Sequence, residues 1–202
     1  ILRYDDGLNG ARSQDMALPE TRTDRRITRE AYERMVRAGA FVGRRVELVG
    51  GIVYEMSPQD SRHAAGLRRT RWVLEEICPE GHQVDVQMPL SLGLDSEPEP
   101  DLAIIRRDPL NYLQGHPTSA ALVVEVAESS LRHDRDKAEI YALAGIEDFW
   151  IVNLVHEVLE VYREPVHETY RTRLVLRRGE RISPLARPDV TVAVDDLLPK
   201  KA

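Results

Sequence analysis

The sequence EPEPDLAIIRRD at residues 97–108 decides the fold, together with LVVEVAESSLRHDRDKAEIYALAG at residues 122–145. Each segment contains a short apolar run that is rich in β-branched residues and bounded by Pro, Gly or Ser, which predicts two buried β-strands. Asp101 opens the first run, and Glu125 lies inside the second. A carboxylate in a buried strand costs free energy unless a metal ion or a cationic group compensates its charge. If the two strands are neighbours, both acids are candidate ligands of a divalent cation.

Lys137 is a candidate third member of this site. It lies on the helix predicted for residues 131–144, which follows the second strand. At about 100° per residue, Lys137 falls between Ala144 and Tyr141 on the apolar arc of that helix, so it is expected to point towards the sheet. A lysine in this position often extends to solvent instead, and a single buried acid often caps a turn or pairs with Arg. The combination of two strand acids with a helical lysine favours a functional site over these alternatives.

The remaining sequence predicts further elements around this segment. Glycine accepts the positive φ of a tight turn, so Gly50-Gly51 predicts a hairpin between strands at residues 45–49 and 52–56. Helices are expected at residues 29–38 and 61–77, and further strands at residues 84–88, 149–154, 158–163 and 170–177. This order predicts an α/β (α+β) fold, in which helices flank a mixed central sheet with antiparallel hairpin extensions.

Length and composition limit the classes of protein. The 202 residues suit one domain, predicted at residues 27–198 after a flexible N-terminal arm at residues 1–26. No apolar run approaches the roughly 20 residues that span a bilayer, and the first residues lack the apolar region of a signal peptide, so no membrane partner is expected. Cys78 is the single cysteine, which fits a reducing compartment and predicts a cytoplasmic protein. The net charge of −6 argues against a general nucleic-acid-coating protein.

Several motifs carry a family resemblance. PEPD at residues 98–101, VVEVA at 123–127 and DRDKAEIYALAGIEDFWIV at 134–152 resemble the Uma-two family of restriction-type endonucleases, which belongs to the PD-(D/E)XK nuclease superfamily. The segments VELVGGIVYEMSP at residues 46–58 and VQMPL at 86–90 extend the resemblance over most of the chain. The resemblance implies a restriction-endonuclease-like core.

The same resemblance implies a Mg²⁺-dependent endonuclease that hydrolyses DNA phosphodiester bonds, with Mn²⁺ as an alternative ion. Asp101 and Glu125 would hold the metal, and the backbone carbonyl of Val126 would add a ligand, because Mg²⁺ prefers hard oxygen donors. In the superfamily pattern a lysine follows the acid by two residues, but this position is Ala127 here. Lys137 would therefore act from the helix, where it would orient the attacking water or stabilise developing negative charge.

Three further polar residues match the family motifs. Glu47, in the first hairpin, would bind a metal ion or hold the lysine. Its alternative role is that of an exposed strand residue opposite Arg45 or Glu55. Gln87 and His63 would line the cleft, although a core-facing amide and a helix-borne imidazole are commonly structural.

Two functions from different classes remain open at this point. The first is the metal-dependent endonuclease, and the second is a catalytically weak or inactive nuclease-fold protein that acts as a binding or assembly module. Ala127 at the usual lysine position and the negative net charge favour the second. The histidines show no HxH or HExxH spacing, which disfavours a zinc enzyme. A homodimer is expected in either case, with the exposed hairpin at residues 158–163 as one candidate contact.

Overall fold

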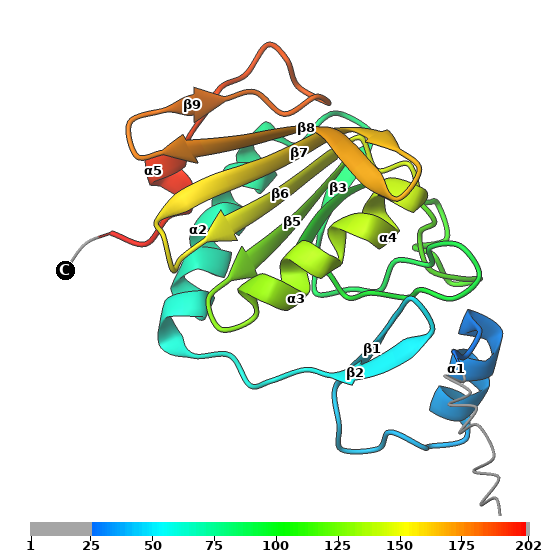
Figure 1. Ribbon diagram of the computed structural model, residues 1–202. Coiled ribbons are helices and arrows are strands. Elements are labelled where there is room, and N and C mark those ends of the chain that lie inside the picture. Colours follow the sequence, from blue (N-terminus) through cyan, green and yellow to red (C-terminus); the bar gives the residue numbers. More distant parts are fainter. Residues whose placement is uncertain (1–25, 201–202) are drawn as a thin grey trace, which may run out of the picture.

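A six-stranded mixed sheet forms the centre of the protein in the computed structural model, which describes residues 26–200 (Figure 1). The predicted N-terminal arm therefore lies, up to residue 25, outside the described residues. The strands follow the order β3-β4-β5-β6-β7-β8, and only β5 and β6 are parallel neighbours. Their bounds are β3 (His82–Val86), β4 (Leu102–Arg106), β5 (Leu122–Ala127), β6 (Asp148–Asn153), β7 (Val158–Val166) and β8 (Thr169–Arg177).

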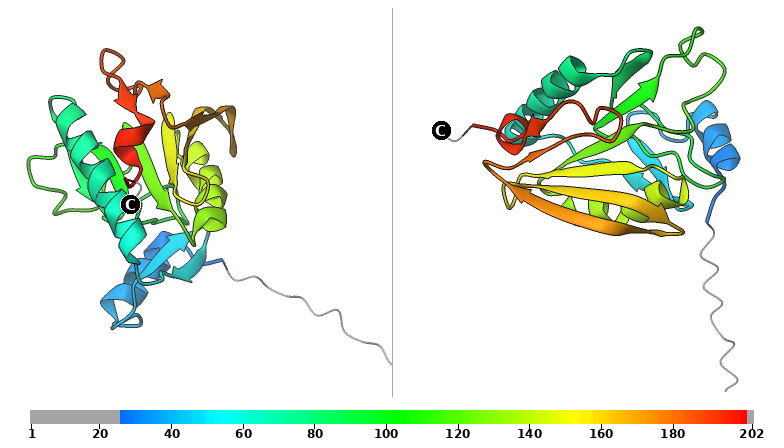
Figure 2. Two further views of the ribbon diagram at one scale, coloured as in Figure 1. Left: turned by 90° about the vertical axis from the view of Figure 1, so that its left-hand side faces the viewer. Right: turned by 90° about the horizontal axis from the view of Figure 1, so that it is seen from above.

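Helices cover both faces of the sheet. Helix α2 (Ser61–Ile77) packs on one face, and the crossover helices α3 (Leu131–Asp136) and α4 (Ala138–Leu143) pack on the other (Figure 2). Every residue of β5 and β6 is buried, because alternate side chains of these strands enter the core on opposite faces. This double burial explains the continuous apolar runs in the sequence and confirms the predicted mixed sheet between helices.

The predicted continuous helix at residues 131–144 is wrong in one respect. The segment forms two short helices that meet at Lys137, which ends α3 and precedes α4. The chain still follows a helical course through the junction, since Lys137 N–H donates to the carbonyl of His133 at 3.0 Å and Tyr141 N–H donates to that of Lys137 at 3.1 Å. The junction therefore keeps Lys137 and Tyr141 one turn apart on the side that faces the sheet.

A separate hairpin of β1 (Val46–Val49) and β2 (Ile52–Glu55) lies beside the main sheet. Gly50 and Gly51 both have positive φ, as the predicted tight turn requires. Leu48 and Glu97 exchange two backbone hydrogen bonds of 3.2 and 2.7 Å, which attach the hairpin to the segment before β4. Helix α1 (Arg29–Arg37) packs on the hairpin through Tyr32 and begins at Thr28, whose side chain accepts a hydrogen bond from Ala31 N–H.

Two predictions about strands need correction. The strand expected to continue to Met88 ends at Val86, because Gln87 adopts a left-handed backbone with φ of 53°. The strand at residues 158–163 is not an exposed edge, because β8 pairs with its far side and the segment is largely buried in the sheet. It therefore cannot provide the predicted dimer contact.

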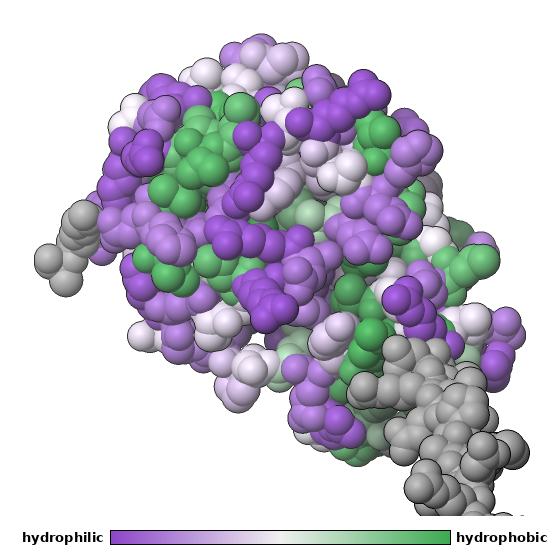
Figure 3. Space-filling model, in the orientation of Figure 1, coloured by the Kyte–Doolittle hydropathy of each residue, from purple (hydrophilic) through white to green (hydrophobic). Residues whose placement is uncertain are grey.

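The C-terminal part completes the layer around α2. Strands β9 (Arg181–Ile182) and β10 (Val192–Ala193) form a small antiparallel pair, and α5 (Val194–Leu197) packs with α2 in one core cluster. Within residues 26–200, none of the helices has the length and apolar character needed to cross a membrane. On the face seen in Figure 3, hydrophilic residues predominate around small, separate hydrophobic patches.

Candidate functional site

The end of the β4–β5 pair brings Asp101 and Glu125 together. The antiparallel register places Leu102 opposite Val124, so that Asp101 and Glu125 flank the point where the ladder ends. Asp101 N–H donates to Glu125 Oε2 at 3.2 Å, and Val126 N–H donates to Asp101 Oδ2 at 2.9 Å. Both acids are buried. Each carboxylate thus accepts a hydrogen bond from a backbone N–H group of the opposite strand, which fixes the two acids beside each other.

Lys137 reaches the same point from the crossover. Its Nζ lies 3.1 Å from Glu125 Oε1 and 2.9 Å from Glu47 Oε2, and the side chain is buried. Ala127 occupies the same face of β5 as Glu125 and packs in the core cluster that contains Tyr141. The position that carries the lysine in the superfamily pattern is thus part of the hydrophobic core here, and the ammonium comes from the helix above it.

Two residues beside this lysine were missed by the sequence analysis. His133 Nε2 lies 2.9 Å from Glu47 Oε1, and Tyr141 O–H donates to Glu125 Oε1 at 2.8 Å. Both lie four residues from Lys137, one helical turn before it and one turn after it. Residues at this spacing share a helix face, so the position of Lys137 could have identified both from the sequence. They extend the cluster without requiring another element of the fold.

Glu47 lies inside the site. It pairs across the hairpin with Tyr54 rather than opposite Arg45 or Glu55, and it is buried. The alternative role as an exposed strand residue is therefore wrong. Besides the ion pair with the lysine, its Oε2 accepts a hydrogen bond from Glu99 N–H at 3.1 Å. The hairpin thus contributes a carboxylate that is held from both sides.

His63 and Gln87 both contact Oδ1 of Asp101. Gln87 Nε2 donates to Asp101 Oδ1 at 3.0 Å, and His63 Nε2 lies 3.3 Å from the same atom. Asp60 caps α2 by accepting hydrogen bonds from the N–H groups of Arg62 and His63, which fixes the helix start. The left-handed backbone at Gln87 is a strained conformation for a non-glycine residue and directs the amide to the acid.

The electrostatics of the cluster are dominated by its carboxylates. Burial raises the pKa of Glu125, and the negative charges of Asp101 and Glu47 add to this effect against the opposing charge of Lys137. Burial and the charge of Glu125 likewise raise the pKa of Asp134 to about 8. Burial and the neighbouring negative charges therefore favour the protonated forms of Glu125 and Asp134.

The pKa values of the basic residues Lys137 and His63 are also raised, and for these residues a raised pKa favours the charged form. Burial disfavours the charged form of Lys137, but the carboxylates of Glu125 and Glu47 outweigh it and raise its pKa. Burial also disfavours the imidazolium of His63, and the hydrogen bond and charge of Asp101 overcome it and raise its pKa. The pKa of Glu47 is lowered despite burial, because His133 and Lys137 stabilise its charge. Lys137 is accordingly a protonated ammonium at neutral pH and not a general base.

These groups line a pocket of about 430 Å³. Within the described part of the chain, no three His, Cys, Asp or Glu side chains are arranged to hold a metal ion. The donor set is instead the pair Asp101 and Glu125, which suits a hard cation such as Mg²⁺ that keeps several waters. Burial raises the pKa of Glu125, with a further contribution from the charges of Asp101 and Glu47, and a divalent cation would oppose both effects. The residues present therefore fit the ion. The lining includes Arg45, Glu47, Tyr54, Met56, His63, Gln87, Asp101, Glu125, His133, Asp134 and Lys137.

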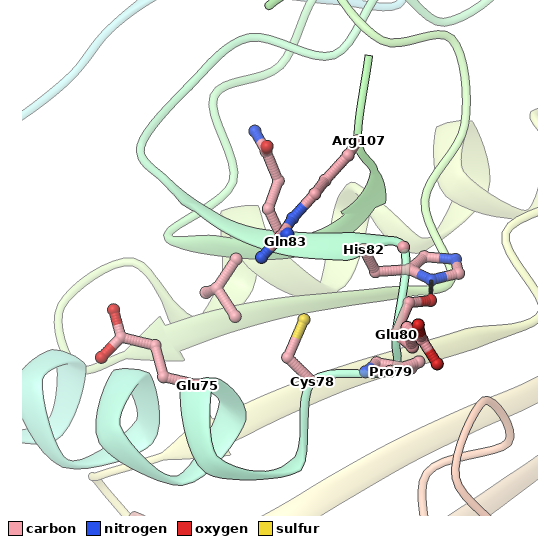
Figure 4. A pocket seen from close by; sticks show the side chains of 9 residues that line it. Glu75, Cys78, Pro79, Glu80, His82, Gln83 and Arg107 are labelled. Carbon is pink, nitrogen blue, oxygen red and sulfur yellow. Dashed lines mark hydrogen bonds between the residues drawn. The ribbon is translucent and has the colours of Figure 1, made fainter. Parts of the chain in front are cut away.

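A second pocket of about 370 Å³ lies at the C-terminal end of α2 (Figure 4). Cys78 ends the helix, is half-buried and lines this pocket, as do Glu75 and His82. Burial raises the pKa of the Cys78 thiol, so the reactive thiolate is disfavoured. This agrees with a structural role for the single cysteine.

A mixed sheet between helices, with two acids and a lysine at the end of its antiparallel pair, defines a restriction-endonuclease-like α/β protein. The chain belongs to the Uma2 family, whose model is described as "Putative restriction endonuclease" and matches residues 29–195. A solved structure with the same fold is described as a "putative nuclease belonging to DUF820 from Anabaena variabilis ATCC 29413". It shares 15% sequence identity with a TM-score of 0.61, over 75% of this chain and 88% of that one. No curated protein matches this chain.

Proposed function

We propose that this protein is a Mg²⁺-dependent endonuclease that hydrolyses DNA phosphodiester bonds. Membership in a family described as a "Putative restriction endonuclease" supports a nuclease activity. The observation that carries the proposal is the convergence of Asp101, Glu125 and Lys137 from two strands and a crossover helix, with Glu125 within hydrogen-bonding distance of both partners. This arrangement combines a pair of oxygen ligands with a fixed positive charge in one pocket.

Each residue has a distinct role in this proposal. When bound between Asp101 and Glu125, a divalent cation supplies charge stabilisation at phosphorus and lowers the pKa of water. The carbonyl of Val126 is the proposed third protein ligand, and Mn²⁺ is expected to substitute for Mg²⁺. Lys137 keeps its proton, so it orients the attacking water and stabilises negative charge that develops on the phosphate.

The remaining residues position these groups. Gln87 and His63 hold Oδ1 of Asp101, which fixes the orientation of its carboxylate. Glu47 holds the ammonium of Lys137 from the side opposite Glu125. Such supporting contacts set the geometry of a site to within fractions of an ångström, on which catalysis depends.

The test is cleavage of supercoiled plasmid DNA and of single-stranded circular DNA by the purified protein with Mg²⁺ or Mn²⁺ and with a chelator. Asp101→Asn and Glu125→Gln should abolish nicking, and the chelator should do the same to the wild-type protein. Glu97→Gln is the matched control, because Glu97 is a buried acid of the same segment outside the pocket. Absence of cleavage with every divalent metal, or equal loss in the control variant, contradicts the proposal.

A second function is favoured by one specific observation. All four oxygens of Asp101 and Glu125 already accept or share hydrogen bonds with protein groups, so the cluster is satisfied by its own fold. The protein would then be a catalytically inactive binding or assembly module. Calorimetric titration with Mn²⁺ separates the two functions, because a module predicts the same heat for the wild-type protein and for Glu125→Gln.

The homodimer remains a proposal, and the contact must be relocated. Strand β8 lies at the edge of the six-stranded sheet, so one of its two sides has no strand partner in that sheet. The strand also exposes Leu174 and Val175. If β8 pairs with the β8 strand of a second copy of the chain, one continuous sheet extends across the dimer. Sedimentation analysis of the wild-type protein and of Val175→Lys tests this contact, since the lysine should favour the monomer.

A further inference from the structure

The groups proposed for catalysis lie below the surface of the protein. Glu125 and Lys137 are each 2% exposed, and Asp101 is 8% exposed. The pocket above them measures about 430 Å³, which is the size of a site for a single small organic ligand. The pocket therefore has room for one phosphate with its nucleotide, which would bring the phosphate down to these groups.

One wall of the pocket is the hairpin β1–β2, which faces α3 (Figure 1). The register pairs Glu47 with Tyr54, so both side chains project from the same face of the hairpin. Glu47 contacts Lys137 at 2.9 Å, while the ring of Tyr54 lies 4.5 Å from the ring of His133, measured between centroids. The same wall thus carries an anchor for the ammonium and an aromatic surface.

Tyr54 has the properties of a stacking residue. His133 supports its ring at an angle of 47°, yet Tyr54 remains 37% exposed and lines the pocket. The contact from His133 to Glu47 and from Glu47 to Lys137 links this ring to the proposed catalytic cluster. Aromatic side chains beside a backbone-binding groove commonly stack unpaired bases, and they do so with little regard to sequence.

An intact DNA duplex does not suit this geometry. Its bases are stacked and paired, so a nucleotide can enter the pocket with its phosphate only after it has been unpaired and rotated out of the duplex. A single strand has no such restriction, because each nucleotide can be rotated out and stacked separately.

Given the nuclease function proposed above, we infer that the substrate is single-stranded or locally unpaired DNA, with one base stacked on Tyr54 and its phosphate at Asp101 and Glu125. Tyr54 is then a substrate-binding residue, and the hairpin is the element that selects unpaired strands.

The experiment compares one labelled oligonucleotide as a single strand and as a blunt duplex, with the full-length protein. Binding is measured by fluorescence anisotropy in Ca²⁺ and cleavage separately in Mg²⁺. The single strand should bind more tightly and be cut faster. Tyr54→Ala should weaken single-strand binding roughly 5- to 150-fold, whereas Tyr54→Phe should retain most of it. Ile52→Ala is the matched control, since Ile52 lies on the same strand and face, is 48% exposed and is outside the pocket.

The outcomes separate this inference from the nuclease function itself. Cleavage of the duplex at the same rate as the single strand, or equal binding losses in Tyr54→Ala and Ile52→Ala, overturns the inference and leaves the nuclease proposal intact. Cleavage of neither DNA, with single-strand binding that depends on the Tyr54 ring, supports the binding site and overturns only the nuclease proposal. Equal affinity of the Tyr54→Ala variant and the wild-type protein for the single strand also overturns the inference.

Discussion

The ammonium of Lys137 lies 2.9 Å from the carboxylate of Glu47, so an ion pair joins the separate hairpin β1–β2 to the crossover on the main sheet. Both side chains are buried. A buried charge that loses its partner is strongly destabilising, because the remaining charge has no water to solvate it. This ion pair therefore connects the architecture of the hairpin to the charge of the proposed site.

The first prediction concerns that pair. Glu47→Gln should lower the free energy of unfolding by roughly 3–5 kcal/mol, since Lys137 would lose one of its two ion-paired carboxylates. Urea denaturation measures the loss. The double variant Glu47→Gln/Lys137→Met should be less destabilised than the sum of the two single variants, by about 0.5–3 kcal/mol. Strict additivity in this cycle would show that the two side chains do not interact.

The second prediction concerns the acid limit of stability. Glu160 is buried in β7, and its carboxylate accepts hydrogen bonds from Arg135, Arg173, Asn153 and Tyr162. Burial alone would raise the pKa of Glu160, but these donors lower it from 4.5 to about 2. An acid whose pKa is lower in the folded state stabilises the fold above its unfolded pKa, and this contribution is lost as the pH falls.

Glu160→Gln should therefore be less stable than the wild-type protein at neutral pH, with a shallower decline in stability between pH 4.5 and 2. Urea denaturation at several pH values in that interval measures both effects. Glu164→Gln, at an exposed position of the same strand, serves as the control and should follow the wild-type curve. Parallel curves for Glu160→Gln and the wild-type protein would refute the role of the network.

The third prediction separates strain from function at Gln87. Its φ of 53° is unfavourable for a residue with a Cβ, and a β-branched side chain tolerates it least. Gln87→Val should destabilise the fold by about 1–3 kcal/mol, whereas Gln87→Gly should change its stability little, because relief of strain offsets the lost hydrogen bond. Gln87→Gly should nevertheless weaken Mn²⁺ binding measured by calorimetry, since Asp101 loses a donor. Unchanged metal affinity in Gln87→Gly would exclude a positioning role.

The fourth prediction compares the two glycines of the hairpin turn. Both have positive φ, but only at Gly51 would a Cβ collide, at 2.6 Å from the Cβ of Arg26. At Gly50 nothing lies within 4 Å of the added atom. Gly51→Ala should thus be less stable than Gly50→Ala by about 1–3 kcal/mol, as measured by thermal unfolding. Equal melting temperatures for the two variants would contradict the close approach of Arg26 to the turn.

Local features of the sequence predicted much of the fold. The predicted bounds of α2 agree with the structure, and the apolar run that begins at residue 122 forms the predicted buried strand β5, because apolar periodicity and capping residues act within a few neighbouring positions. The paired positive φ at Gly50-Gly51 follows for the same reason. Asp101 and Glu125 were recognised because a charge beside or within a short apolar run is conspicuous whatever the surrounding fold.

Long-range contacts were decided only by the tertiary structure. The approach of Glu47 to Lys137, the interior place of β7 and the contact of Tyr54 with His133 depend on strand order and on how the hairpin attaches to the sheet. The break between α3 and α4 at Lys137 is likewise seen only in the folded chain. The sequence by itself determined which segments are helices and strands and which of their residues are unusual, because periodicity and composition are local properties. The meeting of these residues in one pocket required the packing of elements that are distant in the chain, and no local pattern encodes that packing.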